Sequence, residues 1–169
     1  MTINKASEGI LADAMASERG GIIDLLKQAY FSELETVMNY VTNSINPDGV
    51  RAQEIKESLE EDIEEELGHA RQFAERIKEL YGVVPSSVDF SANQHDLQPP
   101  EAQTDVVHVI RGVIAAETSA IELYTRIVAE TEAVDPVTND MVIAILHDEQ
   151  GHRRLFEGFL REYEAEGLA

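Results

Sequence analysis

Two five-residue stretches, EELGH at 65–69 and DEQGH at 148–152, each place a glutamate three residues before a histidine. Residues three positions apart on a helix lie on one face, one turn apart, so Glu66 and His69 can bind the same metal ion. The same holds for Glu149 and His152. One such pair is uninformative in a chain this rich in glutamate. Two copies, each followed by an arginine within two positions, indicate a half-site that occurs twice.

Two further glutamates stand at nearly equal distances before these pairs. Glu33 precedes Glu66 by 33 positions, and Glu117 precedes Glu149 by 32. A tyrosine follows each of the two seven positions later. This internal repeat is typical of a bundle made by duplicating a helical hairpin. The candidate metal ligands are therefore Glu33, Glu66, His69, Glu117, Glu149 and His152, with Tyr40 and Tyr124 near them.

Each of the four glutamates interrupts an otherwise apolar helical stripe, as position 66 does in the series 59, 63, 66, 70 and 73. A carboxylate buried alone in such a stripe becomes protonated or costs free energy, whereas bound cations would stabilise several of them together. Four carboxylates and two imidazoles favour iron or manganese over copper(I), and they supply too many oxygens for structural zinc. One histidine and one terminal carboxylate per metal, with two bridging carboxylates, make a dinuclear centre.

Helix-breaking residues divide the chain into four long segments with helical spacing of apolar residues. The predicted helices cover 21–45, 49–81, 104–132 and 136–165. Short turns join the first two and the last two, so each pair forms an antiparallel hairpin, whereas the segment 82–103 is long enough to cross the whole bundle. The sequence thus predicts an all-α fold: a single domain over 1–169, with 1–20 as an N-terminal extension and one long crossover between the second and third helices.

The composition excludes several kinds of protein. The chain has 33 acidic and 13 basic residues, a net charge of −20, and no cysteine. Such a surface repels nucleic acid and anionic membranes and attracts cations, although an acidic surface adapted to high salt would look the same. The absence of cysteine excludes disulfides and iron–sulfur clusters. No signal peptide or membrane span is recognisable, so we expect a cytoplasmic protein.

The arrangement of Glu, ExxH, Glu and ExxH along four helices resembles the ferritin-like di-iron superfamily. The closest resemblance is to bacterioferritins and Dps-like ferritins, in SELETVMNY around Glu33 and DMVIAILHDEQGH before His152. It covers roughly residues 20–163. By this resemblance Glu33 and Glu117 are terminal ligands, Glu66 and Glu149 bridge, and His69 and His152 supply nitrogen. Tyr40 and Tyr124 either hydrogen-bond a ligand or the opposite carboxylate, or serve only core packing.

The chain also departs from these relatives. Bacterioferritins bind haem through a methionine next to the bridging glutamate of the second helix, and Leu67 stands there, so haem is not expected. Only 17 residues follow His152, too few for the fifth helix of 24-subunit cages. We therefore expect a homo-oligomer, with a dimer or a 12-subunit shell favoured over 24 subunits. The basic tail of DNA-binding Dps proteins is absent, so no nucleic-acid binding is expected.

The leading functional prediction is a ferroxidase that binds two iron ions per subunit and oxidises Fe(II) with O2 or H2O2, for iron storage or detoxification. An alternative of the same architecture is a peroxidase or a dimanganese catalase that consumes peroxide without storing mineral. A third is a metal-binding assembly or stress protein.

Other polar residues are assigned to the surface. Helical rotation predicts that His147 and Glu35 face away from the site, that His108 lies on the opposite face from Glu117, and that His95 lies in the crossover. Asp62 and Glu65 can form an access or satellite metal site, but a solvated acidic face is favoured. Glu65 and Asp148 are predicted to be surface charges. These residues fall outside the predicted centre.

Overall fold

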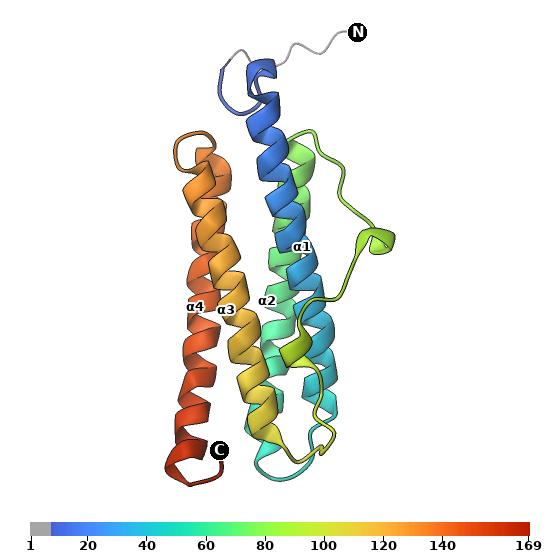
Figure 1. The fold of residues 1–169 in the computed structure, drawn as a ribbon, viewed down its shortest axis with the longest axis vertical. Helices are drawn as coiled ribbons and strands as arrows, with labels where there is room; N and C mark the ends of the chain where they lie inside the picture. The colour runs from blue at the N-terminus through green and yellow to red at the C-terminus, as the bar shows by residue number, and fades with distance from the viewer. Residues whose placement is uncertain (1–7) are drawn as a thin grey trace.

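The computed structural model describes residues 8–169 and contains, over that range, helices but no strand (Figure 1). The four long helices are α1 (Ala16–Ile45), α2 (Ala52–Glu79), α3 (Val106–Thr131) and α4 (Pro136–Ala165). Three short 3-10 helices are η1 (Asp13–Met15), η2 (Ser87–Asp89) and η3 (His95–Leu97). Among the described residues, no helix is both long and apolar enough to cross a bilayer. The predicted all-α four-helix bundle is confirmed.

The helices pack as two antiparallel hairpins, α1 with α2 and α3 with α4 (Figure 1). The crossover runs from the end of α2 to the opposite end of the bundle, where η3 packs against α3. Two clusters of buried apolar side chains fill the interior, one around Leu26 and Phe73 and the other around Leu59 and Phe156. The four glutamates fall between these clusters along their helices, so a polar layer divides the core.

Local sequence signals predict the beginning of α4 correctly but not that of α1. Asp135 caps α4 by accepting a hydrogen bond from the backbone N–H of Thr138, and Pro136 occupies the first turn, as the sequence predicts. By contrast, α1 begins at Ala16 rather than at 21, and so takes in the last residues of the predicted N-terminal extension. The pair Gly20-Gly21 lies inside the helix because the packing of Ile22 and later residues outweighs the low helix propensity of glycine.

Glu35 corrects one sequence-based prediction. It faces away from the metal ligands but is buried, with 5% of its surface exposed. Its carboxylate accepts hydrogen bonds from the backbone N–H groups of Asn93 and Gln94, at 2.8 and 2.9 Å. The Gln94 side chain in turn donates to Thr36 Oγ1 at 2.7 Å. Glu35 is buried because the crossover covers the side of α1 that would otherwise face solvent. Its hydrogen bonds hold the crossover against α1.

Gly112 on α3 makes a second close contact with the crossover. A Cβ atom there would lie 2.5 Å from the carbonyl oxygen of Asp96 and 3.0 Å from the Cα of Leu97. We expect Gly112→Ala to lower the free energy of unfolding by about 1–3 kcal/mol, because backbone must move to admit the methyl group. The control is Gly21→Ala, which meets no atom within 4 Å and should stabilise α1 by up to about 1 kcal/mol. Urea unfolding measures both, and effects of the same sign would contradict the close packing.

Candidate metal centre

All six predicted ligands converge at the middle of the bundle, and each is at least nine-tenths buried. α1 contributes one glutamate, α2 a glutamate and a histidine, α3 one glutamate, and α4 a glutamate and a histidine. Their ligand atoms form two overlapping groups, within which every atom lies within 4.8 Å of the others. The groups are Glu33, Glu66, His69 and Glu149, and Glu66, Glu117, Glu149 and His152. The two glutamates that carry an ExxH motif belong to both groups.

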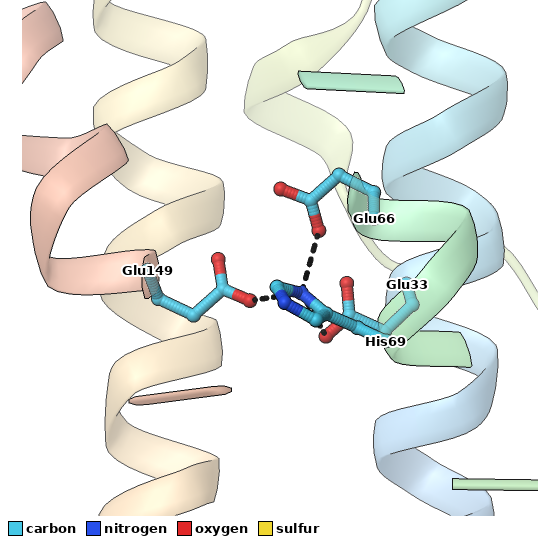
Figure 2. Close-up of side chains that lie close together, drawn as sticks. All are labelled: Glu33, Glu66, His69 and Glu149. Carbon is cyan, nitrogen blue, oxygen red and sulfur yellow. Dashed lines mark ion pairs between the residues drawn. The ribbon is translucent and has the colours of Figure 1, made fainter. Parts of the chain in front are cut away.

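The contacts around the first histidine reach across the bundle. His69 Nδ1 lies 3.1 Å from Glu149 Oε1, 3.7 Å from Glu66 Oε2 and 4.0 Å from Glu33 Oε1. Figure 2 shows the ring between these three carboxylates, which come from α4, α2 and α1. The nearest carboxylate is therefore not the one in its own ExxH motif.

The second histidine repeats this arrangement. His152 Nδ1 lies 3.2 Å from Glu66 Oε1 and 3.7 Å from Glu149 Oε2. Each histidine thus approaches most closely the glutamate on the opposite helix. The two ExxH motifs are interleaved, with both shared glutamates between the two rings.

Several of these buried atoms have no hydrogen-bond partner among residues 8–169. They are both carboxylate oxygens of Glu66, Oε1 of Glu149, and Nδ1 of His69 and His152. Buried polar atoms are nearly always hydrogen-bonded, and leaving one unpaired costs about 1–3 kcal/mol. Cations between them would give every one of these atoms a ligand bond. The donor set therefore fits two metal ions that share the two central carboxylates.

Two tyrosines orient the remaining carboxylates. Tyr40 on α1 donates a short hydrogen bond to Glu117 on α3, and Tyr124 on α3 donates one to Glu33 on α1. Both tyrosines are fully buried. Of the two interpretations given to them from the sequence, the structure favours hydrogen bonding to the opposite carboxylate. Each bond leaves the second oxygen of its glutamate available to a metal ion.

The outer nitrogen of each histidine also faces carboxylates. His69 Nε2 lies 3.4 Å from Asp148 Oδ2. His152 Nε2 lies 3.4 Å from Glu65 Oε2 and 3.7 Å from Asp62 Oδ1. The sequence favours a solvated acidic face for these three acids, with an access or satellite metal site as the alternative for Asp62 and Glu65. Glu65 is exposed, as predicted, but all three acids also line the outer edge of the centre between α2 and α4. Helical spacing cannot reveal this, because each histidine contacts an acid on the opposite helix.

The other histidines lie away from the centre, as predicted. His147 is exposed on α4, and His95 begins η3 in the crossover. His108 Nε2 lies 2.9 Å from the carbonyl oxygen of Gln98, so it helps to hold the crossover against α3.

Without a metal ion, the four carboxyl groups differ in charge. Burial, reinforced by the charge of Glu66, raises the pKa of Glu33 well above its ordinary value. Burial and the charge of Glu149 do the same to the pKa of Glu117. Burial also acts upward on the pKa values of Glu66 and Glu149, but close contacts outweigh it and lower both pKa values. These contacts are with Glu33 and then the two histidines for Glu66, and with the two histidines for Glu149. These shifts favour the ionised form in the central pair and the protonated form in the terminal pair.

The histidines carry protons as well. Burial alone would lower their pKa values, but the contacts with Glu149 and Glu66 outweigh it and raise the pKa of His69 to about 10 and that of His152 to about 12. Both rings are imidazolium ions at neutral pH. In the metal-free protein, the positive charges of the two rings thus neutralise the negative charges of Glu66 and Glu149. A metal ion that binds here takes the place of these ring protons.

We expect binding of divalent metal to release both histidine protons, together with the protons that burial favours on Glu33 and Glu117. Because the histidine pKa values lie above 7, raising the pH from 6 to 8 should strengthen binding, by about tenfold per pH unit for each proton released. Calorimetric titration with Co(II) in buffers of different ionisation enthalpy counts the protons. His147→Gln, which changes an exposed histidine, should leave the count unaltered. Binding that does not depend on pH would contradict histidine ligation.

Comparisons with known proteins agree with the fold. A model of the ferritin-like domain matches residues 23–165. The chain is 32% identical over 151 residues to the DNA protection during starvation protein of Pyrococcus furiosus, which covers 85% of this chain and 81% of that protein.

Solved structures give the same result. The bacterioferritin-related protein of Bacteroides fragilis superimposes with a TM-score of 0.76 at 24% identity, over 88% of this chain and 89% of that one. The bacterioferritin of Desulfovibrio desulfuricans gives 0.75 at 22% identity, over 89% and 84%. At these identities the likeness shows the fold, while the domain match and the Pyrococcus relative show the family. The chain belongs to the ferritin-like family.

Proposed function

We propose that this protein is a ferroxidase, which binds two Fe(II) ions between its four helices and oxidises them with O2 or H2O2 for iron storage or detoxification. The observation that carries the proposal is the set of buried donor atoms, lacking hydrogen bonds, between four carboxylates and two imidazoles. Iron is the substrate here, and manganese is the other metal that this donor set suits.

We assign the ligands of each iron position from the two overlapping groups of donor atoms described above. Each iron position takes one histidine, one terminal carboxylate and one oxygen from each bridging carboxylate. The division is His69 with Glu33 at one position, His152 with Glu117 at the other, and Glu66 with Glu149 as the bridges. The tyrosines hold the terminal carboxylates in place, and the apolar clusters on either side limit access of water. The bridges bring the two ions close enough to deliver two electrons together.

The electron balance is simple. Two Fe(II) ions give up two electrons and become Fe(III). With H2O2 the two electrons and two protons yield two molecules of water, and with O2 they yield one molecule of H2O2. The negative charges of the carboxylates stabilise the higher charge of Fe(III). The protons that the histidines and the terminal glutamates lose when iron binds pass to solvent.

We also propose that the chain works as a homo-oligomer, as a 12-subunit shell or a dimer. The Bacteroides relative is described as dodecameric. Apolar side chains on the outside of α1 support this, because Met38, Val41 and Ile45 recur every three to four residues and are 58%, 41% and 67% exposed. Such a stripe is typical of a surface that is covered in an assembly.

Protection of DNA by direct contact is not part of the proposal. The Pyrococcus relative is named for DNA protection during starvation, but a net charge of −20 opposes binding to phosphates. Consumption of Fe(II) and peroxide would protect DNA without contact.

The test is anaerobic loading with two equivalents of Fe(II), followed by O2 in one sample and H2O2 in another. A ferroxidase should form Fe(III) rapidly and consume one H2O2 for every two Fe(II). Release of O2 from H2O2 without net oxidation of iron would instead identify a catalase and overturn the proposal.

A further inference from the structure

The two halves of the centre are related by the internal repeat, with one exception. A shift of 83 positions takes Glu66 to Glu149, and it likewise relates the two histidines and the acids that precede the bridging glutamates. The same shift takes Asp62 to Ile145. Ile145 is buried in one of the apolar clusters, whereas Asp62 is a carboxylate whose side chain is only 13% exposed. The repeat therefore loses its symmetry one helical turn before the bridging glutamate.

The asymmetric residue contacts one histidine only. Asp62 Oδ1 lies 3.7 Å from His152 Nε2, on the side of the ring that faces away from the centre. Its second oxygen, Oδ2, is buried and has no hydrogen-bond partner within the described part of the chain. Among the residues that the structure describes, His152 Nε2 thus has two carboxylates within 3.7 Å, those of Glu65 and Asp62, whereas His69 Nε2 has one, that of Asp148.

These outer acids are better suited to orienting the histidines than to binding a third ion. Asp62, Glu65 and His152 lie close enough to hold a metal through Nε2. An imidazole that binds a metal through Nδ1 keeps its proton on Nε2, however, and donates it to a neighbouring carboxylate. The donated hydrogen bond fixes the ring and strengthens the nitrogen as a ligand. A carboxylate present at only one ring will therefore strengthen only one metal position.

We propose that Asp62 is a positioning residue that makes the two metal positions unequal, so that the position formed by His152 and Glu117 binds its divalent cation first and more tightly than the position formed by His69 and Glu33. The inference rests on the proposed dinuclear centre. Asp62 acts on the first position through its ion pair with His152, at 3.7 Å, and through the additional negative charge that it places there. At the second position, Ile145 supplies neither.

Calorimetric titration of the metal-free protein with Co(II) tests this proposal. The unaltered protein should bind two ions in two steps, the first at least about tenfold tighter, as expected for a partner of a metal-bound histidine. Asp62→Ile introduces at position 62 the residue type of its repeat partner, Ile145. It should weaken the affinity of the first binding step by about 10–100-fold and leave that of the second step unchanged. Asp62→Asn keeps the shape and the acceptor oxygen, and should give a smaller loss.

The matched control is Glu61→Gln, which removes one exposed charge from the adjacent position and should leave both steps unchanged. Anomalous diffraction from crystals given one equivalent of Co(II) locates the first ion, which we expect beside His152. Equal affinities in the unaltered protein, a first ion beside His69, or equal losses in Asp62→Ile and Glu61→Gln would overturn the inference. Binding of fewer than two ions in total would instead overturn the dinuclear centre itself.

Discussion

The double substitution Glu66→Ala with Glu149→Ala is expected to abolish rapid oxidation of Fe(II), leaving the slow rate of Fe(II) in buffer. These two carboxylates belong to both ligand groups, and each lies beside both histidines. Their loss removes a ligand pair from each metal position at once. Replacing a residue that only supports a ligand costs about 10–100-fold in metal affinity or activity, so losing both bridges should cost at least about 100-fold. Stopped-flow absorbance after mixing with O2 measures the rate.

The control removes two exposed glutamates from the same two helices. Glu64→Ala with Glu162→Ala makes the same change in net charge but touches none of the six ligands. It should oxidise Fe(II) at the unaltered rate, and far-UV circular dichroism should show helical folds for both double variants. Fast oxidation in the variant without the two bridges would contradict the assignment of the site.

Arg76→Ala is expected to lower the free energy of unfolding by about 3–5 kcal/mol, the usual cost of removing one partner of a buried ion pair. Arg76 is 7% exposed, and its guanidinium donates to Asp135 Oδ1 and Thr138 Oγ1, both at 2.8 Å. Asp135 is fully buried and caps α4, so the substitution leaves its charge unpaired at the helix terminus. The contact joins α2 to α4, and its loss should loosen the end of the bundle.

An exposed arginine on the same helix gives the comparison. Arg71 pairs only with Glu75, at 3.1 Å, and its side chain is 80% exposed. Arg71→Ala should cost less than about 1 kcal/mol, since surface ion pairs contribute little. Urea unfolding of the metal-free protein measures both variants. Similar losses for the two arginines would contradict a structural role for the buried pair.

Most of the fold could be predicted because its signals are local. Apolar periodicity marks the four helices, and Asp135 with Pro136 marks the beginning of α4. The beginning of α1 was predicted too late because tertiary packing overrides two glycines. The burial of Glu35 was missed because it depends on where the crossover, a segment without helical periodicity, passes over α1.

In the candidate centre too, features within one helix can be predicted from the sequence, whereas contacts between helices cannot. The six proposed ligands can be predicted from the sequence because each ExxH pair or single glutamate occupies a core position on its own helix, and because the repeat relates the two halves. The sequence names Asp62 and Glu65 only as a less favoured access or satellite metal site, and it does not predict the contacts of Asp62, Glu65 and Asp148 with the histidines. They arise from the relative position of α2 and α4, which are far apart in the chain, and periodicity within one helix contains no information about it.

The most direct test of the dinuclear centre is anomalous diffraction at the iron edge from crystals of the protein loaded anaerobically with Fe(II). Two iron peaks are predicted in each chain, one beside His69 and Glu33 and one beside His152 and Glu117, with the carboxylates of the two bridging glutamates between them. Iron bound only at the acidic surface, or a single ion among the six side chains, would contradict the centre proposed here.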